Sequence, residues 1–133
     1  MTNLFVLDDD PVFHRLIQLS VSRAKPFKGV YHHYDAVALL NYIRNNRHDA
    51  VNLPDVLFVD IKMPGLDGWG FLDALQNIYY TLNKKVQVYI VTVSVIKDDQ
   101  TRAFTYPFVK DFIVKPITLT QLVHIANTAQ LAG

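Results

Sequence analysis

Short apolar runs that each stop at a polar residue constrain the fold of this chain more than any other feature. The runs and the residues that end them are Leu4–Leu7 with Asp8-Asp9-Asp10, Val56–Val59 with Asp60, Val86–Val91 with Thr92, and Phe112–Val114 with Lys115-Pro116. Runs of this length are typical of strands that are buried on both faces, as in parallel sheets. We therefore expect four buried strands, each of which carries a polar group at its carboxyl end.

A fifth, more polar strand is predicted at residues 30–34. Helices are predicted between the strands from apolar spacing and capping residues, over residues 11–24, 36–45, 69–80, 97–105 and from 119 onward. Alternation of strands and helices is typical of α/β proteins with right-handed connections. The predicted fold is a three-layer, five-stranded parallel sheet with helices on both faces and the flavodoxin-like strand order 2-1-3-4-5.

Composition narrows the classes of protein that this chain can belong to. Its 133 residues suit one domain, so residues 1–133 are expected to form a single unit with no output domain. The net charge is +1 and basic residues are not clustered, which gives no reason to expect binding to nucleic acid or to a membrane surface. Cysteine is absent, and no signal peptide or membrane-spanning run is evident, so the expected location is the cytoplasm.

Polar residues at the strand ends predict a site for phosphoryl chemistry. Ligands bind at the carboxyl ends of the strands in an open parallel sheet, where Asp8, Asp9, Asp60, Thr92 and Lys115 are expected to meet. Clustered carboxylates repel one another unless a cation is present, and their hard oxygen atoms suit Mg²⁺. One carboxylate can then act as a nucleophile that forms an acyl phosphate, while a lysine attracts the phosphate oxygens.

The motifs at these strand ends occur together and in order. They are Val6-Leu7-Asp8-Asp9-Asp10-Pro11, Val59-Asp60-Ile61-Lys62-Met63-Pro64-Gly65-Leu66-Asp67-Gly68, Ile90-Val91-Thr92 and Val114-Lys115-Pro116. With these motifs, essentially the whole chain resembles the receiver domain of response regulators in two-component signalling, in its single-domain, chemotaxis-regulator-like form. The resemblance implies a phosphoacceptor that is not an enzyme for other substrates and catalyses only its own phosphorylation and dephosphorylation.

The resemblance also implies a role for each matching residue. The implied roles are phosphoacceptor for Asp60, direct Mg²⁺ ligand for Asp9, metal ligand through a water molecule for Asp8, metal ligand by its backbone carbonyl for Lys62, phosphate binding for Thr92 and Lys115, and aromatic switch for Phe112. Asp60 itself would complete the metal site, and the Lys115–Pro116 bond is expected to be cis. The implied partners are a histidine kinase or histidine phosphotransfer protein and a downstream protein that the sequence does not identify.

Two features depart from the family pattern. Lys62 stands two residues after the acceptor, where a side chain tends to influence dephosphorylation. The segment before the last strand reads Phe104-Thr105-Tyr106-Pro107-Phe108 in place of the usual Gly-Ala pair. The resemblance therefore does not predict the form of the fourth helix or of its partner-binding surface.

Two alternative functions remain to be weighed. Asp8, Asp10 and Val12 match the first motif of haloacid-dehalogenase-type phosphatases, in which Asp8 would be the nucleophile. A receiver-shaped interaction module that is never phosphorylated is the other alternative, since having these residues is not the same as using them. In the favoured interpretation Asp10 and Asp67 cap helices, and the histidines, which lack metal-ligand spacing, are structural or lie on the surface.

Overall fold

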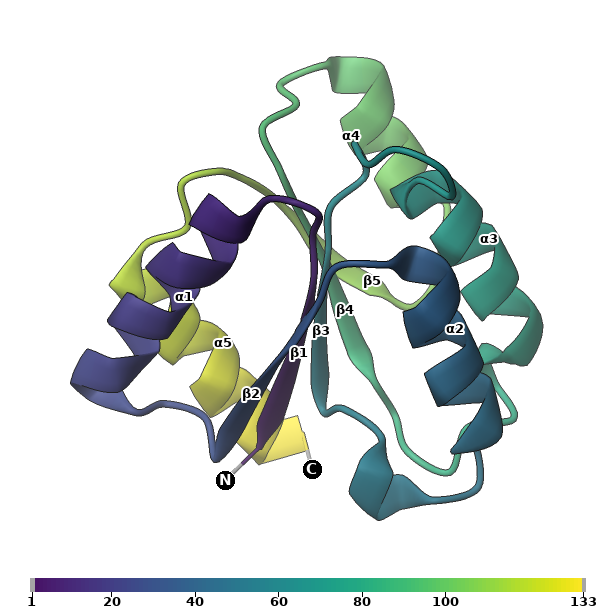
Figure 1. The fold of residues 1–133 in the computed structure, drawn as a ribbon, viewed down its shortest axis with the longest axis horizontal. Helices are drawn as coiled ribbons and strands as arrows, with labels where there is room; N and C mark the ends of the chain where they lie inside the picture. The colour runs from purple at the N-terminus through teal and green to yellow at the C-terminus, as the bar shows by residue number, and fades with distance from the viewer. Residues whose placement is uncertain (1, 133) are drawn as a thin grey trace.

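The computed structural model describes residues 2–132, and its centre is a parallel sheet with the strand order β2-β1-β3-β4-β5 (Figure 1). The strands are β1 (Asn3–Leu7), β2 (Gly29–His33), β3 (Val56–Val59), β4 (Gln87–Thr92) and β5 (Val109–Val114). This confirms the predicted α/β class and the flavodoxin-like strand order. The reversal of strand order beside β1 places the carboxyl ends of β1 and β3 next to each other.

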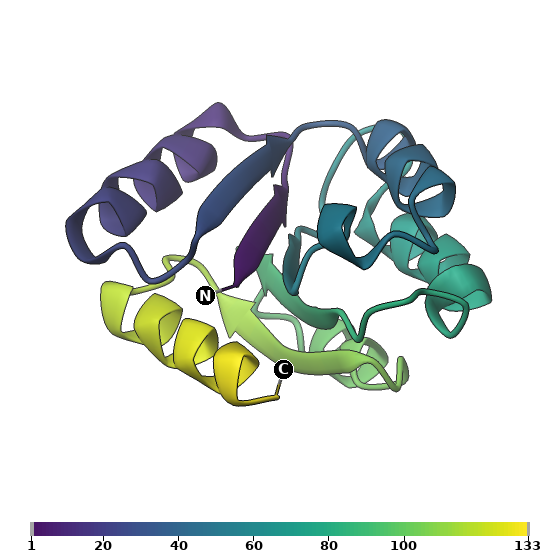
Figure 2. The same ribbon diagram turned by 90° about the horizontal axis from the view of Figure 1, so that it is seen from below.

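Helices cover both faces of the sheet (Figures 1 and 2). They are α1 (Pro11–Ala24), α2 (Ala36–Asn45), α3 (Gly68–Tyr79), α4 (Lys97–Ala103) and α5 (Leu119–Ala132), with a short 3₁₀ helix η1 (Ala50–Asn52) before β3. Figure 2 shows α1 and α5 on one side of the sheet and α2 and α3 on the other. None of the helices in residues 2–132 has the length and apolar character needed to cross a membrane.

Two apolar cores form because successive side chains of a strand point to opposite faces. In β1, Leu4 and Val6 pack with α1 and α5, whereas Phe5 and Leu7 pack with α2 and α3. All four residues of β3 are buried, which explains why its sequence is apolar without alternation. Packing on both faces therefore holds the central strands in place, and it also fixes the position of the residues that directly follow these strands.

The helix starts are fixed by the capping residues that the sequence predicted. The Asp10 carboxylate accepts a hydrogen bond from the Val12 N–H at 2.9 Å. Asp67 accepts one from the Gly70 N–H at 2.9 Å. Each cap satisfies a backbone donor that has no partner inside its helix, and so sets where the chain turns after the strand.

The β5 strand and α4 differ in length from their predicted extents. β5 begins at Val109 rather than at Phe112, because Lys110 and Asp111 are exposed and interrupt the apolar run that marked the strand. A register shift between Val88 and Tyr89 of the neighbouring β4 accompanies this start. α4 ends at Ala103, earlier than the predicted end at residue 105.

Gly68 is a position where the fold leaves no room for a side chain. A Cβ atom there would lie 2.3 Å from the Asp60 carbonyl oxygen and 2.5 Å from the Ile61 Cα. We expect Gly68→Ala to lower the free energy of unfolding by about 1–3 kcal/mol, since backbone must move to relieve the overlap. Urea unfolding would measure the loss.

Gly70→Ala is the matched control for this prediction. An added Cβ at position 70 meets the Leu66 Cδ1 at 2.5 Å, and that flexible side-chain end can turn away. Alanine also favours a helix over glycine by about 1 kcal/mol. Equal destabilisation by the two substitutions would contradict the packing argument.

Candidate functional site

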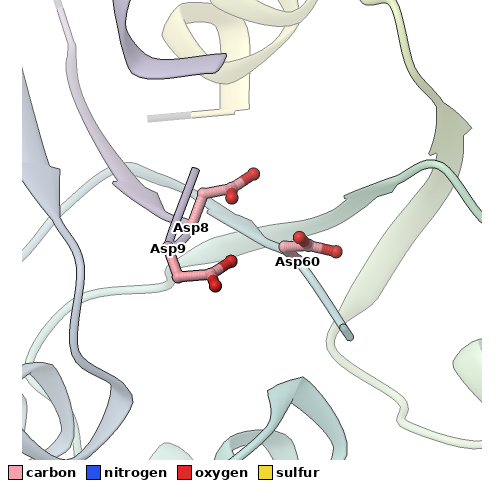
Figure 3. Close-up of side chains that lie close together, drawn as sticks. All are labelled: Asp8, Asp9 and Asp60. Atoms are coloured by element: carbon pink, nitrogen blue, oxygen red, sulfur yellow. The ribbon is translucent and has the colours of Figure 1, made fainter. Parts of the chain in front are cut away.

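Three aspartates converge at the carboxyl edge of the sheet (Figure 3). Asp8 and Asp9 directly follow β1, and Asp60 directly follows β3. One carboxylate oxygen from each residue lies within 4.8 Å of those from the other two. Asp8 and Asp60 are buried while Asp9 is exposed, so the cluster opens to solvent on the side of Asp9.

The Asp8 carboxylate is fully buried and held by two donors. Its Oδ1 accepts a hydrogen bond from the Asp10 N–H at 2.8 Å, and its Oδ2 accepts one from Lys115 Nζ at 2.6 Å. The backbone N–H of Asp8 also donates to the His33 carbonyl at 3.1 Å, which continues the β1–β2 pairing by one residue. These bonds fix Asp8 in one orientation.

Lys115 brings a positive charge between the two buried carboxylates. Its Nζ lies 2.6 Å from Asp8 Oδ2 and 3.6 Å from Asp60 Oδ2. The same ammonium lies 4.2 Å from the centre of the Phe13 ring, a favourable cation–π position. The Lys115–Pro116 peptide bond is cis, as the family resemblance implied.

Asp60 stands in an environment that disfavours its charge. Burial raises the pKa of Asp60 above its ordinary value, and the Asp8 carboxylate adds to this. The Lys62 N–H, which donates to Asp60 Oδ1 at 3.1 Å, and the Lys115 ammonium oppose the rise in pKa. A cation at this position would relieve the remaining repulsion between carboxylates.

Thr92 completes the edge from the end of β4 and is fully buried. Its carbonyl accepts a hydrogen bond from the Lys115 N–H at 2.8 Å, which joins the fourth and fifth strand ends. Sequence reasoning missed a contact in the loop after Thr92, where the Ser94 hydroxyl donates to the Asp99 carboxylate at 2.6 Å and so fixes this loop. A serine two residues after the strand end, followed by an acid in the next helical turn, was the available signal.

Phe112 belongs to the core, as do Tyr106 and Phe108 of the unusual segment before β5. Phe112 is buried among the side chains on the α2–α3 face of the sheet. Tyr106 is also buried, stacks on Trp69 and donates its hydroxyl to Asp73. Burial together with the Asp73 carboxylate raises the pKa of Tyr106 to about 12, so the hydroxyl keeps its proton. The segment between α4 and β5 therefore packs against α3 through Tyr106.

The donor set of the edge fits Mg²⁺. Three carboxylates within reach of one point supply hard oxygen ligands, and an exposed Asp9 leaves space for water and for phosphate oxygens. Asp10, in contrast, uses its Oδ1 to cap α1. The site can bind a divalent cation and present one carboxylate to an incoming phosphoryl group.

One curated protein is similar in sequence to part of this chain. "Probable methanogenesis regulatory protein FilR2" of Methanothrix harundinacea (strain 6Ac) is 26% identical over 88 residues, which cover 66% of this chain and 55% of that protein. The chain thus matches about half the length of this curated relative. What is known of the rest of that protein does not transfer to the chain.

Solved structures share the fold across nearly the whole chain. A two-component response regulator from Cytophaga hutchinsonii has a TM-score of 0.85 at 22% identity, covering 97% of this chain and 96% of that one. A response regulator receiver domain from Clostridium thermocellum has a TM-score of 0.76 at 22% identity, covering 99% and 96%. Residues 4–127 match the family described as "Response regulator receiver domain". The chain belongs to the response regulator receiver domain family.

Proposed function

We propose that this receiver domain is a phosphorylation switch that accepts a phosphoryl group on Asp60 with Mg²⁺ bound beside it. The observation that carries the proposal is the position of Lys115 Nζ, 2.6 Å from Asp8 and 3.6 Å from Asp60, at the edge of a three-carboxylate cluster. A lysine that faces an acceptor carboxylate can pair with the phosphate oxygens once the acyl phosphate forms. The proposed setting is the cytoplasm.

Each residue has a defined part in the proposed reaction. The Asp60 carboxylate attacks the phosphorus of a phosphohistidine in a histidine kinase or phosphotransfer protein. A P–O bond forms, the P–N bond breaks, and the released imidazole takes up a proton. Asp9, Asp60 and the Lys62 backbone carbonyl would hold Mg²⁺, with Asp8 acting through water. The metal supplies positive charge for the phosphoryl oxygens, and the chain supplies orientation.

The proposed output is a change in a partner-binding surface. An acyl phosphate adds about −1.5 to −2 charges if it titrates like other protein phosphates. The Thr92 hydroxyl, at the end of β4, would bind a phosphate oxygen and draw the following loop toward the site. Val93, Val95 and Ile96 of that loop are exposed apolar residues, so its movement changes the surface that a partner meets. Phe112 would adjust its packing in the same step.

Intact mass after incubation with acetyl phosphate tests the proposal. Wild-type protein should gain one phosphoryl group with Mg²⁺ and none with EDTA, and hydroxylamine should remove it, because acyl phosphates are labile to this nucleophile. Asp9→Ala should slow the gain by weakening Mg²⁺ binding. If acetyl phosphate fails, a kinase with ATP is the second donor. A folded protein that gains no phosphoryl group from either donor would instead support the unphosphorylated interaction module.

A further inference from the structure

Two histidines from different elements meet directly behind the acidic site. His14 lies in α1 and is 1% exposed, and His32 lies in the edge strand β2. Their Nδ1 atoms are 2.6 Å apart, within hydrogen-bonding distance. The other ring nitrogen of His14, Nε2, lies 2.8 Å from the backbone carbonyl oxygen of Asp8. A series of contacts therefore runs from the edge of the sheet to a residue of the proposed metal site.

The direction of these hydrogen bonds follows from what each atom can do. A carbonyl oxygen only accepts, so His14 Nε2 must carry the proton that it donates to Asp8. In the neutral ring, His14 Nδ1 is then an acceptor, and His32 Nδ1–H is its donor. His32 thus selects the tautomer of His14 that can hold the Asp8 carbonyl. The Tyr34 ring, with its centre 4.1 Å from that of His14, restrains the imidazole from one side.

His14 completes the set of bonds around Asp8. The N–H of Asp8 is bound to the strand β2, and both carboxylate oxygens have donors. The His14 imidazole holds the carbonyl, and this carbonyl belongs to the peptide group that joins Asp8 to Asp9. The orientation of that peptide plane decides where the Asp9 side chain leaves the backbone. His14 and His32 thus influence the orientation of the exposed Asp9 carboxylate through the backbone, without contacting that carboxylate.

We propose that His14, oriented by His32, is a positioning residue for Mg²⁺ binding at Asp8, Asp9 and Asp60. This inference rests on the proposed function, because it assigns a residue to the metal site on which that function depends. In many metal sites, residues that hydrogen-bond to the metal ligands orient these ligands, and His14 would have this role here. Removal of such partners typically weakens metal binding by about 10- to 100-fold.

Mg²⁺ titration of the full chain, followed by amide NMR with no phosphodonor present, tests the role of His14. His14→Phe keeps an aromatic ring at this buried position but removes the donor, and it should raise the Mg²⁺ midpoint about 10-fold. His14→Gln, whose side-chain amide can replace the Nε2–H donor, should restore a midpoint near that of the wild type. In wild-type protein, long-range ¹H–¹⁵N spectra of the imidazoles should show a protonated Nε2 and an unprotonated Nδ1 for His14.

Two control variants separate positioning from loss of packing. Ile17→Val removes a methyl group from a buried residue of the same helix, and it should lower thermal stability without moving the Mg²⁺ midpoint. His124→Gln alters an exposed histidine on α5 and should change neither. An unchanged midpoint in His14→Phe, or an equal shift in Ile17→Val, would overturn the positioning role. A wild-type protein that binds no Mg²⁺ would overturn the proposed metal site itself, and the positioning role with it.

Discussion

Asp60→Asn is expected to abolish phosphoryl uptake and, at neutral pH, to make the folded protein more stable. Asparagine has no carboxylate to form an acyl phosphate, so the mass gain from acetyl phosphate should disappear. The stability gain follows from the raised pKa of Asp60. Burial is the main cause of this rise in pKa and the nearby Asp8 carboxylate adds to it, and together they outweigh the opposing effects of the Lys62 N–H and the Lys115 ammonium. A neutral amide of the same shape removes that cost, and stabilising substitutions of this kind give about 0.5–2 kcal/mol.

The pH dependence gives this prediction its sign. The pKa of Asp60 is higher in the folded protein than in the unfolded chain, so folding is favoured while the carboxyl is protonated in both states. This advantage is lost as the pH rises from the unfolded pKa, ordinarily about 3.9, through the folded pKa. Urea unfolding at pH 7 should therefore show a more stable Asp60→Asn variant, and the difference should vanish when the pH falls below the unfolded value.

Adding Mg²⁺ provides a control for the stability difference between Asp60→Asn and the wild type. A bound cation neutralises the carboxylates of the wild type, so saturating Mg²⁺ should narrow or reverse the stability difference. A variant that is less stable than the wild type at pH 7 without Mg²⁺ would contradict the electrostatic argument. Retained Mg²⁺-dependent labelling of Asp60→Asn would move the acceptor to another residue.

Sequence reasoning located the parts of the site that are fixed by strand ends. Asp8, Asp60, Thr92 and Lys115 each follow an apolar run, and the carboxyl ends of parallel strands lie at one edge of the sheet. Their meeting is a consequence of topology alone, so alternation of strands and helices was enough to predict it. Helix caps such as Asp10 were predictable for a similar reason, since capping depends on residues close in sequence.

Contacts between side chains that are distant in sequence could not be predicted in the same way. His14 and His32 are 18 residues apart, and Tyr106 and Asp73 are 33 apart. Periodicity indicates which face of an element is buried, but not which residue of another element lies opposite. The sequence therefore predicted only that His14, like the other histidines, is structural or lies on the surface, and it gave no sign of the contacts with His32 and Asp8. The start of β5 was misplaced because the exposed Lys110 and Asp111 give this edge strand a polar beginning.

Lys115→Met is expected to cause the largest loss of stability among substitutions at the site. The Asp8 side chain is 1% exposed, and Lys115, 12% exposed, is its ionic partner at 2.6 Å. Methionine fills similar space but leaves the buried Asp8 charge beside Asp60 without its ionic partner, and within residues 2–132 only the Asp10 N–H still donates to it. Breaking a buried pair by removing one partner typically costs about 3–5 kcal/mol. Urea unfolding at pH 7 without Mg²⁺ would measure the change.

A double-mutant cycle shows whether the lost charge pair is the cause. In an Asp8→Asn background, Lys115→Met should cost far less, because no buried carboxylate is then left unpaired at that position. Lys84→Met is the matched control: Lys84 pairs with Asp55 at 3.2 Å, but both side chains are more than a fifth exposed, so its loss should cost only about 0–1 kcal/mol. Saturating Mg²⁺ should restore part of the stability of Lys115→Met by supplying positive charge near the same carboxylates. Equal costs of Lys115→Met with and without the Asp8→Asn substitution would mean that the lysine stabilises the fold through its contact with the Phe13 ring rather than through its pairing with Asp8.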